Sequence, residues 1–282
     1  MKWTILGSGG CQVIPKPLCN CPVCAEARAK GVPYSRTGPS AFLSDIGLLV
    51  DTPAEVASQL NNNSIEQVRY LILTHLDPDH TEGFRVVEQI ALDFRTWTAY
   101  PEKQVCLLVP HYLADRLHTL TSQYGSFAEF FLRRGFLSIE PFEESITIEG
   151  VKITAVPVDT GNQKSSVYVF TKGGKKLVYA TCDIKPFPEY HPESQNPDIL
   201  VIQPGIFEDG LKHGFVYPDE HISRKSHYTF PETLALAGRI GAKKTILVHL
   251  EEYWNRTYDQ YREMETQYTK IAFAYDGMQI LT

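Results

Sequence analysis

The 282-residue sequence has no apolar run as long as the roughly 18 to 20 residues that span a bilayer. It also has no cluster of more than two lysines or arginines outside Lys172–Lys176, and its formal net charge is −6. The first absence argues against a membrane span. The second disfavours a long DNA or RNA partner, because such proteins usually carry a basic stripe on their surface. A small anionic substrate is compatible with this composition.

Nucleotide-binding glycine motifs are missing too. Neither G-x-G-x-x-G nor the Walker pattern occurs, so the glycines of Gly7–Gly10 are expected to form a tight turn beside a site. The preceding Lys2–Leu6 is strand-like from the start of the chain, which argues against a secretory leader and favours a cytoplasmic location. With 43% apolar and 21% charged residues, the composition is that of a soluble globular protein.

Four metal-capable side chains follow a buried strand. The apolar run Tyr70–Leu73 reads as that strand, and His75, Asp77, Asp79 and His80 come directly after it. Isolated histidines and aspartates in loops are usually solvated, and Asp-Pro-Asp alone is typical of a turn. Two imidazoles and two carboxylates at this spacing instead predict a metal site suited to zinc, manganese or iron.

A second candidate metal site is a cysteine cluster. Cys19, Cys21 and Cys24 form a C-x-C-x-x-C pattern within a segment, about 11–38, that also contains several prolines. Thiolates this close cannot all pair as disulfides without strain, but they can surround one structural zinc if a fourth ligand comes from elsewhere. A redox pair and inert thiols are the alternatives.

The segment His75–His80 resembles the His-x-His-x-Asp-His signature of the metallo-β-lactamase superfamily, with Asp77 in place of the second histidine. The cysteine cluster is similar to the accessory zinc loop of one branch, that of phosphoribosyl cyclic phosphodiesterase and pyrroloquinoline quinone biosynthesis protein B. The resemblance covers nearly all of the chain. It implies an α/β fold, a four-layer αββα sandwich formed by residues 1–282 as one domain, with the site at one edge of its two sheets.

The resemblance also implies roles for particular residues. One metal would be held by Asp79, His80, Asp183 and His249, and the other by His75, Asp77 and the same Asp183, which would bridge the two. Thr160 stands where a further histidine is expected. The second set therefore has hard oxygen donors in place of imidazoles, which favours manganese, iron or magnesium, or leaves that metal position empty. Beside Asp183, Cys182 could be a ligand, although a small buried thiol is the simpler interpretation.

Two more residues take their expected roles from the same branch. Glu252 stands where relatives carry the histidine that completes the accessory zinc, and a carboxylate can replace it. His227 precedes an expected helix, Pro231–Ile240, and is the candidate acid or phosphate contact; its other interpretation is a neighbour of the helix cap. With Asp79, it makes up the expected catalytic pair.

The implied reaction is hydrolysis of a small cyclic or nucleotide-like phosphodiester by a metal-activated water, with one or two zinc, manganese or iron ions at the centre. Two alternatives stay open. One is an iron-dependent hydroxylase resembling pyrroloquinoline quinone biosynthesis protein B, and the other is a non-catalytic metal-binding protein. Relatives are often dimers, so a homodimer is compatible with the resemblance. The segment His111–Phe136 is expected to be mostly helical.

Overall fold

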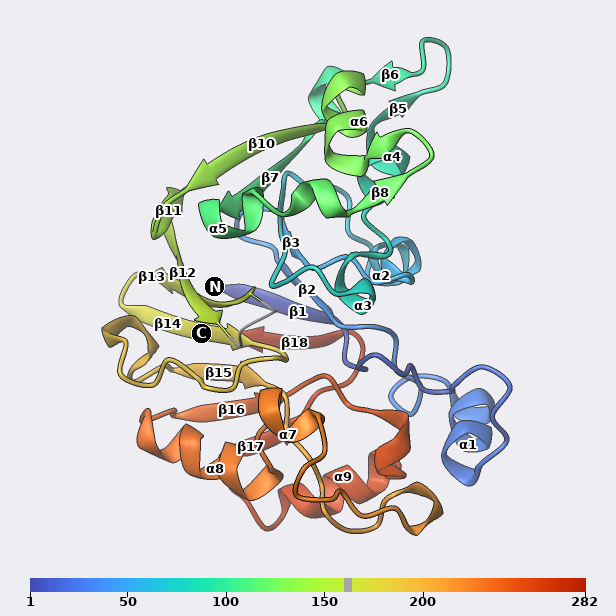
Figure 1. The fold of residues 1–282 in the computed structure, drawn as a ribbon, viewed down its shortest axis with the longest axis vertical. Coiled ribbons are helices and arrows are strands. Elements are labelled where there is room, and N and C mark those ends of the chain that lie inside the picture. The colour runs from blue at the N-terminus through green and yellow to red at the C-terminus, as the bar shows by residue number, and fades with distance from the viewer. Residues whose placement is uncertain (160–163) are drawn as a thin grey trace.

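The computed structural model describes residues 1–159 and 164–282, and two seven-stranded sheets dominate it (Figure 1). The first sheet has the strand order β10 (Leu137–Phe142), β7 (Val105–Pro110), β4 (Tyr70–Ile72), β3 (Leu48–Val50), β2 (Ser40–Leu43), β1 (Lys2–Gly7) and β18 (Met278–Leu281). The second has the order β11 (Ser145–Ile148), β12 (Val151–Asp159), β13 (Lys164–Lys172), β14 (Lys175–Ala180), β15 (Ile199–Ile202), β16 (Lys244–Leu247) and β17 (Ile271–Phe273). Antiparallel pairing of β1 with β18 brings the two ends of the chain together.

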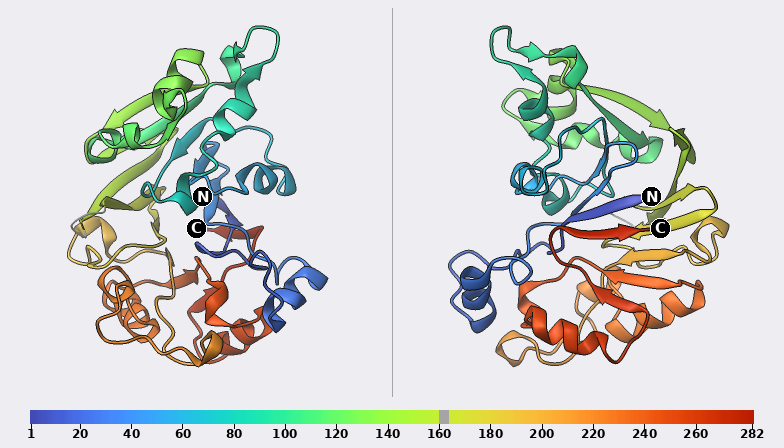
Figure 2. Two further views of the ribbon diagram at one scale, coloured as in Figure 1. Left: turned by 45° about the vertical axis from the view of Figure 1, so that its right-hand side comes forward. Right: turned by 180° about the vertical axis from the view of Figure 1, so that it is seen from behind.

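Helices lie outside the sheets or in the connections between strands. They are α1 (Pro22–Lys30), α2 (Val56–Asn62), α3 (Pro78–Thr81), α4 (Val86–Ala91), α5 (His111–Ala114), α6 (Phe127–Arg134), α7 (Ser223–Ser226), α8 (Phe230–Arg239) and α9 (Tyr258–Glu265). Short 3₁₀ turns are η1 (Pro101–Lys103), η2 (Leu117–Thr119), η3 (Pro192–Ser194), η4 (Lys212–Gly214) and η5 (Glu252–Trp254). Views from two other directions show α1 standing apart from the sheets (Figure 2). No helix within the described residues is long and apolar enough to cross a membrane.

Among the described residues, three large apolar cores establish the layers. One lies between the sheets, where Trp3 of β1 packs against Phe170 and Tyr179 of the second sheet. A second lies between the outer face of the first sheet and α2, α4 and α6. A third lies between the outer face of the second sheet and α8 and α9. Three cores require four layers, so the predicted αββα sandwich is confirmed.

The same alternation of side chains builds all three cores. Successive residues of a strand point to opposite faces, so Tyr168 and Phe170 face the other sheet while Val167 and Val169 face the helices. Because both faces of these strands are buried, they read as continuous apolar runs rather than alternating ones. Burial on both sides is why these runs could be recognised as strands, whereas the sandwich itself was implied by the family resemblance.

The segment His111–Phe136 differs from the sequence expectation. Its ends are helical, in α5 and α6, but a small hairpin formed by β8 (Thr121–Ser122) and β9 (Gly125–Ser126) interrupts it. Gly125 has φ +89°, a conformation that favours glycine, and Ser126 caps α6 by accepting a hydrogen bond from the N–H of Glu129. The sequence predicted a mostly helical segment, whereas local turn chemistry divides it. A second small hairpin pairs β5 (Leu92–Asp93) with β6 (Thr98–Ala99).

Candidate metal centre

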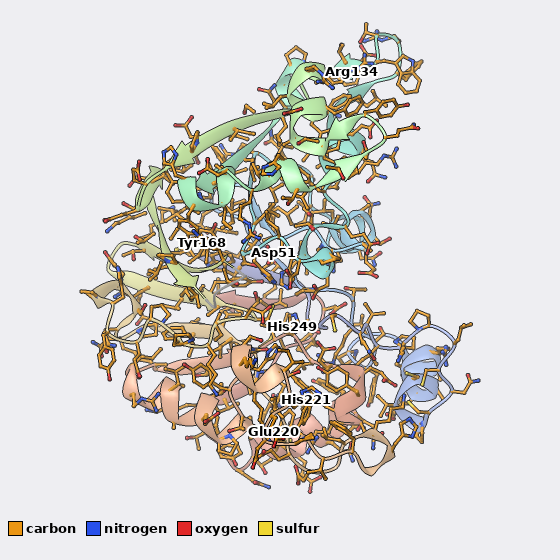
Figure 3. The ribbon with its side chains drawn as sticks, viewed as in Figure 1. Asp51, Arg134, Tyr168, Glu220, His221 and His249 are labelled. Carbon is orange, nitrogen blue, oxygen red and sulfur yellow. The ribbon has the colours of Figure 1, made fainter. Side chains whose placement is uncertain are left out.

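Four strands, two from each sheet, have their carboxyl ends at one place between the two sheets. Asp51 follows β3, His75 lies in the loop after β4, Asp183 lies in the loop after β14, and His249 follows β16. Figure 3 labels Asp51 and His249, which come from the two different sheets and lie near the centre of the view. The carboxyl edge of parallel strands is where α/β folds usually place their ligands.

Three of these strand-end residues have left-handed backbone conformations. Asp51, Asp183 and His249 have φ values of 60°, 49° and 58°. Such conformations cost non-glycine residues on the order of 1 kcal/mol each and collect at functional sites, where the surrounding structure enforces them. Here they turn three side chains inward at the point where the strands end. This clustering supports a functional role for the strand ends.

The structure brings the predicted ligands together in two sets, although it groups Asp183 only with His75 and Asp77 and not with Asp79, His80 and His249 as well. Asp79 Oδ2 lies 3.3 Å from His249 Nε2 and 3.5 Å from His80 Nε2. In the second set, His75 Nε2 lies 3.8 Å from Asp77 Oδ2 and 3.9 Å from Asp183 Oδ2. Within each set the donor atoms lie within 4.8 Å of one another, close enough to share one metal ion. Thr160 lies outside the described residues.

The buried carboxylate of Asp51 orients both histidines of the segment His75–His80. It accepts hydrogen bonds from His80 Nδ1 (2.8 Å), the Thr74 N–H (2.7 Å) and the Thr74 hydroxyl (2.8 Å). That hydroxyl accepts in turn from His75 Nδ1, at 2.9 Å. Because both Nδ1 atoms donate, both Nε2 atoms are left to bind a metal.

Sequence reasoning missed Asp51. Asp51 could have been recognised from the sequence, because it directly follows the apolar run Leu48–Val50, just as the segment His75–His80 follows Tyr70–Leu73.

Electrostatics of the first set are consistent with an ionised carboxylate. Burial alone would raise the pKa of Asp79, but its hydrogen bond to His249 and the charge of His80 hold that pKa well below the usual range. A carboxylate stabilised by buried imidazoles is a ready ligand for a divalent cation.

A glutamate orients the last histidine. Glu251 Oε1 lies 3.3 Å from His249 Nδ1, and the same carboxylate accepts the backbone N–H groups of Cys11 and Gln12, each at 3.0 Å. A Cβ on Gly10 would lie 2.1 Å from Glu251 Oε1 and 2.5 Å from His249 Nδ1, so only glycine fits there. The segment Gly7–Gly10 therefore passes directly beside the site, as the sequence suggested.

His227 lies at the edge of the second set. Its Nδ1 is 3.8 Å from Asp183 Oδ1 and 2.8 Å from the Ser226 hydroxyl, and a quarter of the side chain is exposed. Thr229 caps α8 through a capping box with Glu232, which holds His227 in an extended conformation between α7 and α8. His227 therefore lies next to the cap of α8 and also at the edge of the second set of candidate ligands.

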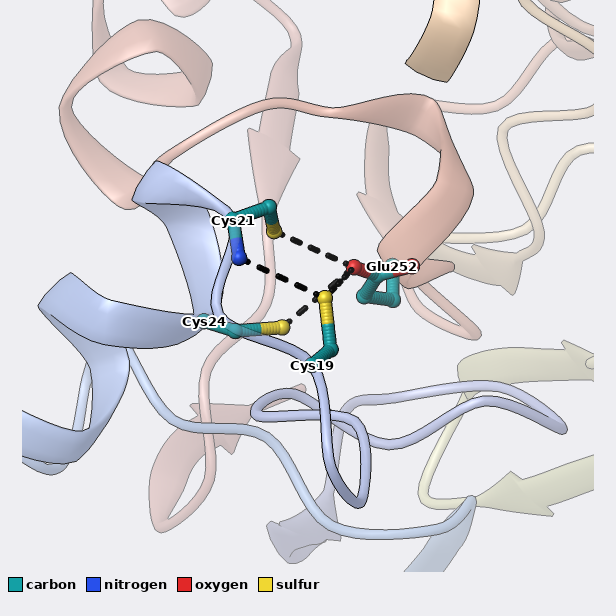
Figure 4. Close-up of side chains that lie close together, drawn as sticks. All are labelled: Cys19, Cys21, Cys24 and Glu252. Atoms are coloured by element: carbon teal, nitrogen blue, oxygen red, sulfur yellow. Dashed lines mark hydrogen bonds between the residues drawn. The ribbon is translucent and has the colours of Figure 1, made fainter.

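The cysteine cluster converges on one carboxylate oxygen (Figure 4). Glu252 Oε1 lies 3.4 Å from Cys19 Sγ, 3.3 Å from Cys21 Sγ and 3.3 Å from Cys24 Sγ. Lys212 Nζ contacts the same oxygen and lies 3.0 Å from Cys19 Sγ. Burial would raise the pKa of Glu252, but Lys212 and the cysteines lower it to about 2.

Both clusters fit a bound metal. Three sulfurs and one carboxylate oxygen around a common point make the four-donor set of a structural zinc site. At the centre, His80 Nε2 and His249 Nε2 face each other at 3.4 Å, an arrangement that a shared cation stabilises. Ile14, Val23 and Ala27 form a small separate core that supports the cysteine loop.

We expect Glu252→Gln to weaken zinc binding by the cysteine loop, because the neutral amide oxygen is a poorer ligand than the carboxylate. The loss should exceed the roughly 10- to 100-fold that removal of an outer-shell partner costs. Competition with a chromophoric chelator measures it, and Glu220→Gln, an exposed position, is the matched control. Glu252→His should retain the ion. Unchanged affinity in Glu252→Gln would show that the fourth ligand lies elsewhere.

A two-sheet αββα sandwich with histidines and carboxylates at the ends of its strands defines the metallo-β-lactamase class of fold. The chain belongs to the beta-lactamase superfamily, because the family model described as "Beta-lactamase superfamily domain" matches residues 47–250, well over half of its length. The predicted membership is thereby confirmed. No curated protein sequence matches the chain.

Solved structures resemble the chain over its full length. A diphosphatase of the PhnP family matches with TM-score 0.72 and 22% identity, covering 100% of this chain and 97% of the other. Zn²⁺-bound PqqB from Methylobacterium extorquens matches with TM-score 0.74 and 18% identity, covering 100% of both chains. The short form of human tRNase Z matches with TM-score 0.63 and 15% identity, covering 100% and 99%. At these identities the likeness establishes the fold.

Proposed function

We propose that the chain is a metal-dependent phosphodiesterase that acts on a small cyclic or nucleotide-like phosphodiester. The observation that carries the proposal is the pair of carboxylate–imidazole sets, Asp79 with His80 and His249, and His75 with Asp77 and Asp183, in one buried centre. Resemblance in fold to a diphosphatase and to tRNase Z supports phosphoryl chemistry. The net charge of −6 and the lack of a basic stripe favour a small substrate over a long nucleic acid.

The residues divide the work between binding and proton transfer. The first set would hold one divalent metal and the second set another, with zinc, manganese or iron as candidates. A metal held there would supply an activated water, with a pKa towards about 7, and positive charge beside the phosphoryl oxygens. Asp51 and Glu251 keep the Nε2 atoms of His80 and His249 directed at the centre. His227, beside Asp183 and partly exposed, can protonate a leaving oxygen.

Metal reconstitution tests the proposal. Protein freed of metal by chelation should regain hydrolysis of bis-p-nitrophenyl phosphate, and of a 2′,3′-cyclic nucleotide, when zinc, manganese or iron is restored. A long single-stranded RNA should be a poor substrate. No turnover with any of the three ions would refute the phosphodiesterase. Oxygen consumption with iron instead would favour the hydroxylase, and metal binding without either reaction would favour a non-catalytic protein.

We expect His227→Gln to slow the reaction selectively for poor leaving groups. A general acid contributes about 10²-fold or more when the leaving oxygen needs a proton, and little when it does not. The variant should therefore lose about 10²-fold in kcat on a phosphodiester with an alkyl leaving group while changing little on a p-nitrophenyl ester. Equal losses on both substrates would assign His227 to phosphate binding rather than acid catalysis.

A further inference from the structure

A cysteine thiol lies inside the candidate metal centre. Cys182 is 5% exposed, and its Sγ lies 3.4 Å from His75 Nε2 and 3.3 Å from His80 Nε2. The Nδ1 atoms of both rings are engaged by Thr74 and Asp51. The sulfur therefore faces the two ring nitrogens that are left for metal binding.

The two imidazoles beside the sulfur belong to different ligand sets. His75 is grouped with Asp77 and Asp183, whereas His80 is grouped with Asp79 and His249. The carboxylate of Asp183, which the sequence suggested as the bridge, lies with His75 on one side and with His227 on the other. Cys182 Sγ therefore contacts a histidine of each set, whereas Asp183 is grouped only with the set of His75 and Asp77.

An inert buried thiol would have different surroundings. Cys106 of β7, which is partly buried, provides the comparison within this chain, because it packs against the apolar core between the two sheets. Free cysteines of that kind behave as small apolar groups. Cys182 instead has imidazole nitrogens as its nearest neighbours, at the end of β14, where Asp183 has a left-handed backbone conformation.

We propose that Cys182 is a thiolate ligand shared by the two metal positions, an inference that rests on the proposed metal-dependent function. On binding, the thiol loses its proton to solvent and the sulfur lone pairs bond to the metals, so no oxidant or reductant is needed. A soft sulfur donor favours zinc over manganese or magnesium. It offsets the harder character that Asp77 gives the second set and selects zinc for the centre.

Cadmium-113 NMR of the cadmium-loaded full chain tests the assignment without reference to activity. Cadmium bound by thiolates resonates far downfield of cadmium bound only by nitrogen and oxygen, and the cysteine loop and the centre should give separate signals. We expect both signals of the wild-type centre to be downfield-shifted. In Cys182→Ser both should move upfield, while the loop signal stays in place and shows that the variant is folded.

Two matched variants complete the design. Cys106→Ser should leave every signal unchanged, and Glu252→Gln should move the loop signal far more than either centre signal. Movement of one centre signal alone in Cys182→Ser would overturn the sharing, and movement of neither would overturn the assignment as a ligand. The wild-type chemical shifts alone decide the matter if Cys182→Ser fails to fold. Downfield centre signals in a chain without phosphodiesterase activity would refute the proposed function but not the ligand.

Discussion

Asp79→Asn is expected to reduce kcat/KM for bis-p-nitrophenyl phosphate by about 10³-fold, at the upper end of what losing one preorganised electrostatic contact costs an enzyme. The carboxylate lies between His80 and His249, and its hydrogen bond to His249 and the charge of His80 hold its pKa well below the usual range. The amide has a similar shape but lacks the charge. Metal analysis of the purified variant should show one ion fewer per chain than the wild type.

The control for Asp79→Asn is Glu82→Gln. Glu82 lies three residues further along, just beyond α3, and is exposed to solvent. This variant removes the same charge from the same segment and should retain wild-type turnover and metal content. A wild-type rate in Asp79→Asn would exclude the first set as the catalytic metal site. A full complement of metal with lost turnover would instead assign Asp79 to catalysis alone.

Asp51→Ala is expected to lower the free energy of unfolding by about 3 kcal/mol, measured by urea denaturation at neutral pH. Its carboxylate is fully buried and accepts three hydrogen bonds, so alanine leaves the Thr74 N–H and His80 Nδ1 without their partner. Breaking a buried, hydrogen-bonded ionic network costs about 3–5 kcal/mol. Metal affinity should fall about 10- to 100-fold as well, because His80 is no longer oriented.

Asp45→Ala is the matched control for Asp51→Ala. Asp45 lies in the turn before β3, at the other end of that strand, and forms a partly exposed ion pair with Lys172 at 3.2 Å. Asp45 also accepts the Lys2 N–H at 2.7 Å, so losing this hydrogen bond and the ion pair should cost about 1 kcal/mol, well below the loss in Asp51→Ala. An equal loss of stability in both variants would mean that the buried network around Asp51 has no special importance.

The sequence was most informative where structure and chemistry are local. The motif His75–His80 directly follows its strand, so its four candidate ligands could be named from their spacing. The apolar runs predicted individual strands, whereas the four layers were implied by the family resemblance. The side chains of the motif diverge into two sets because Pro78 starts a short helix, which turns Asp79 and His80 away from Asp77. That division followed from the family resemblance and not from the spacing.

What could not be predicted depends on contacts between distant segments. Asp51 is separated from His80 by 29 positions, and Lys212 from Glu252 by 40. No periodicity within either segment encodes such contacts. Cys182 was set aside because a buried cysteine after a strand usually belongs to the core. The Cys182 side chain points into the centre because the backbone turns at the end of β14, where Asp183 has a positive φ. This backbone conformation is visible only in three dimensions.

Glu251 and Glu252 are consecutive, yet the first holds His249 of the centre and the second holds the cysteine loop. A backbone shift that releases one carboxylate must disturb the other, so the two sites are linked through a single peptide bond. Any free energy of coupling is reciprocal. Filling the cysteine loop should therefore raise the affinity of the centre, and filling the centre should slow loss of metal from the loop. Under metal scarcity, such positive cooperativity would divide the molecules into fully loaded and empty ones rather than half-loaded ones.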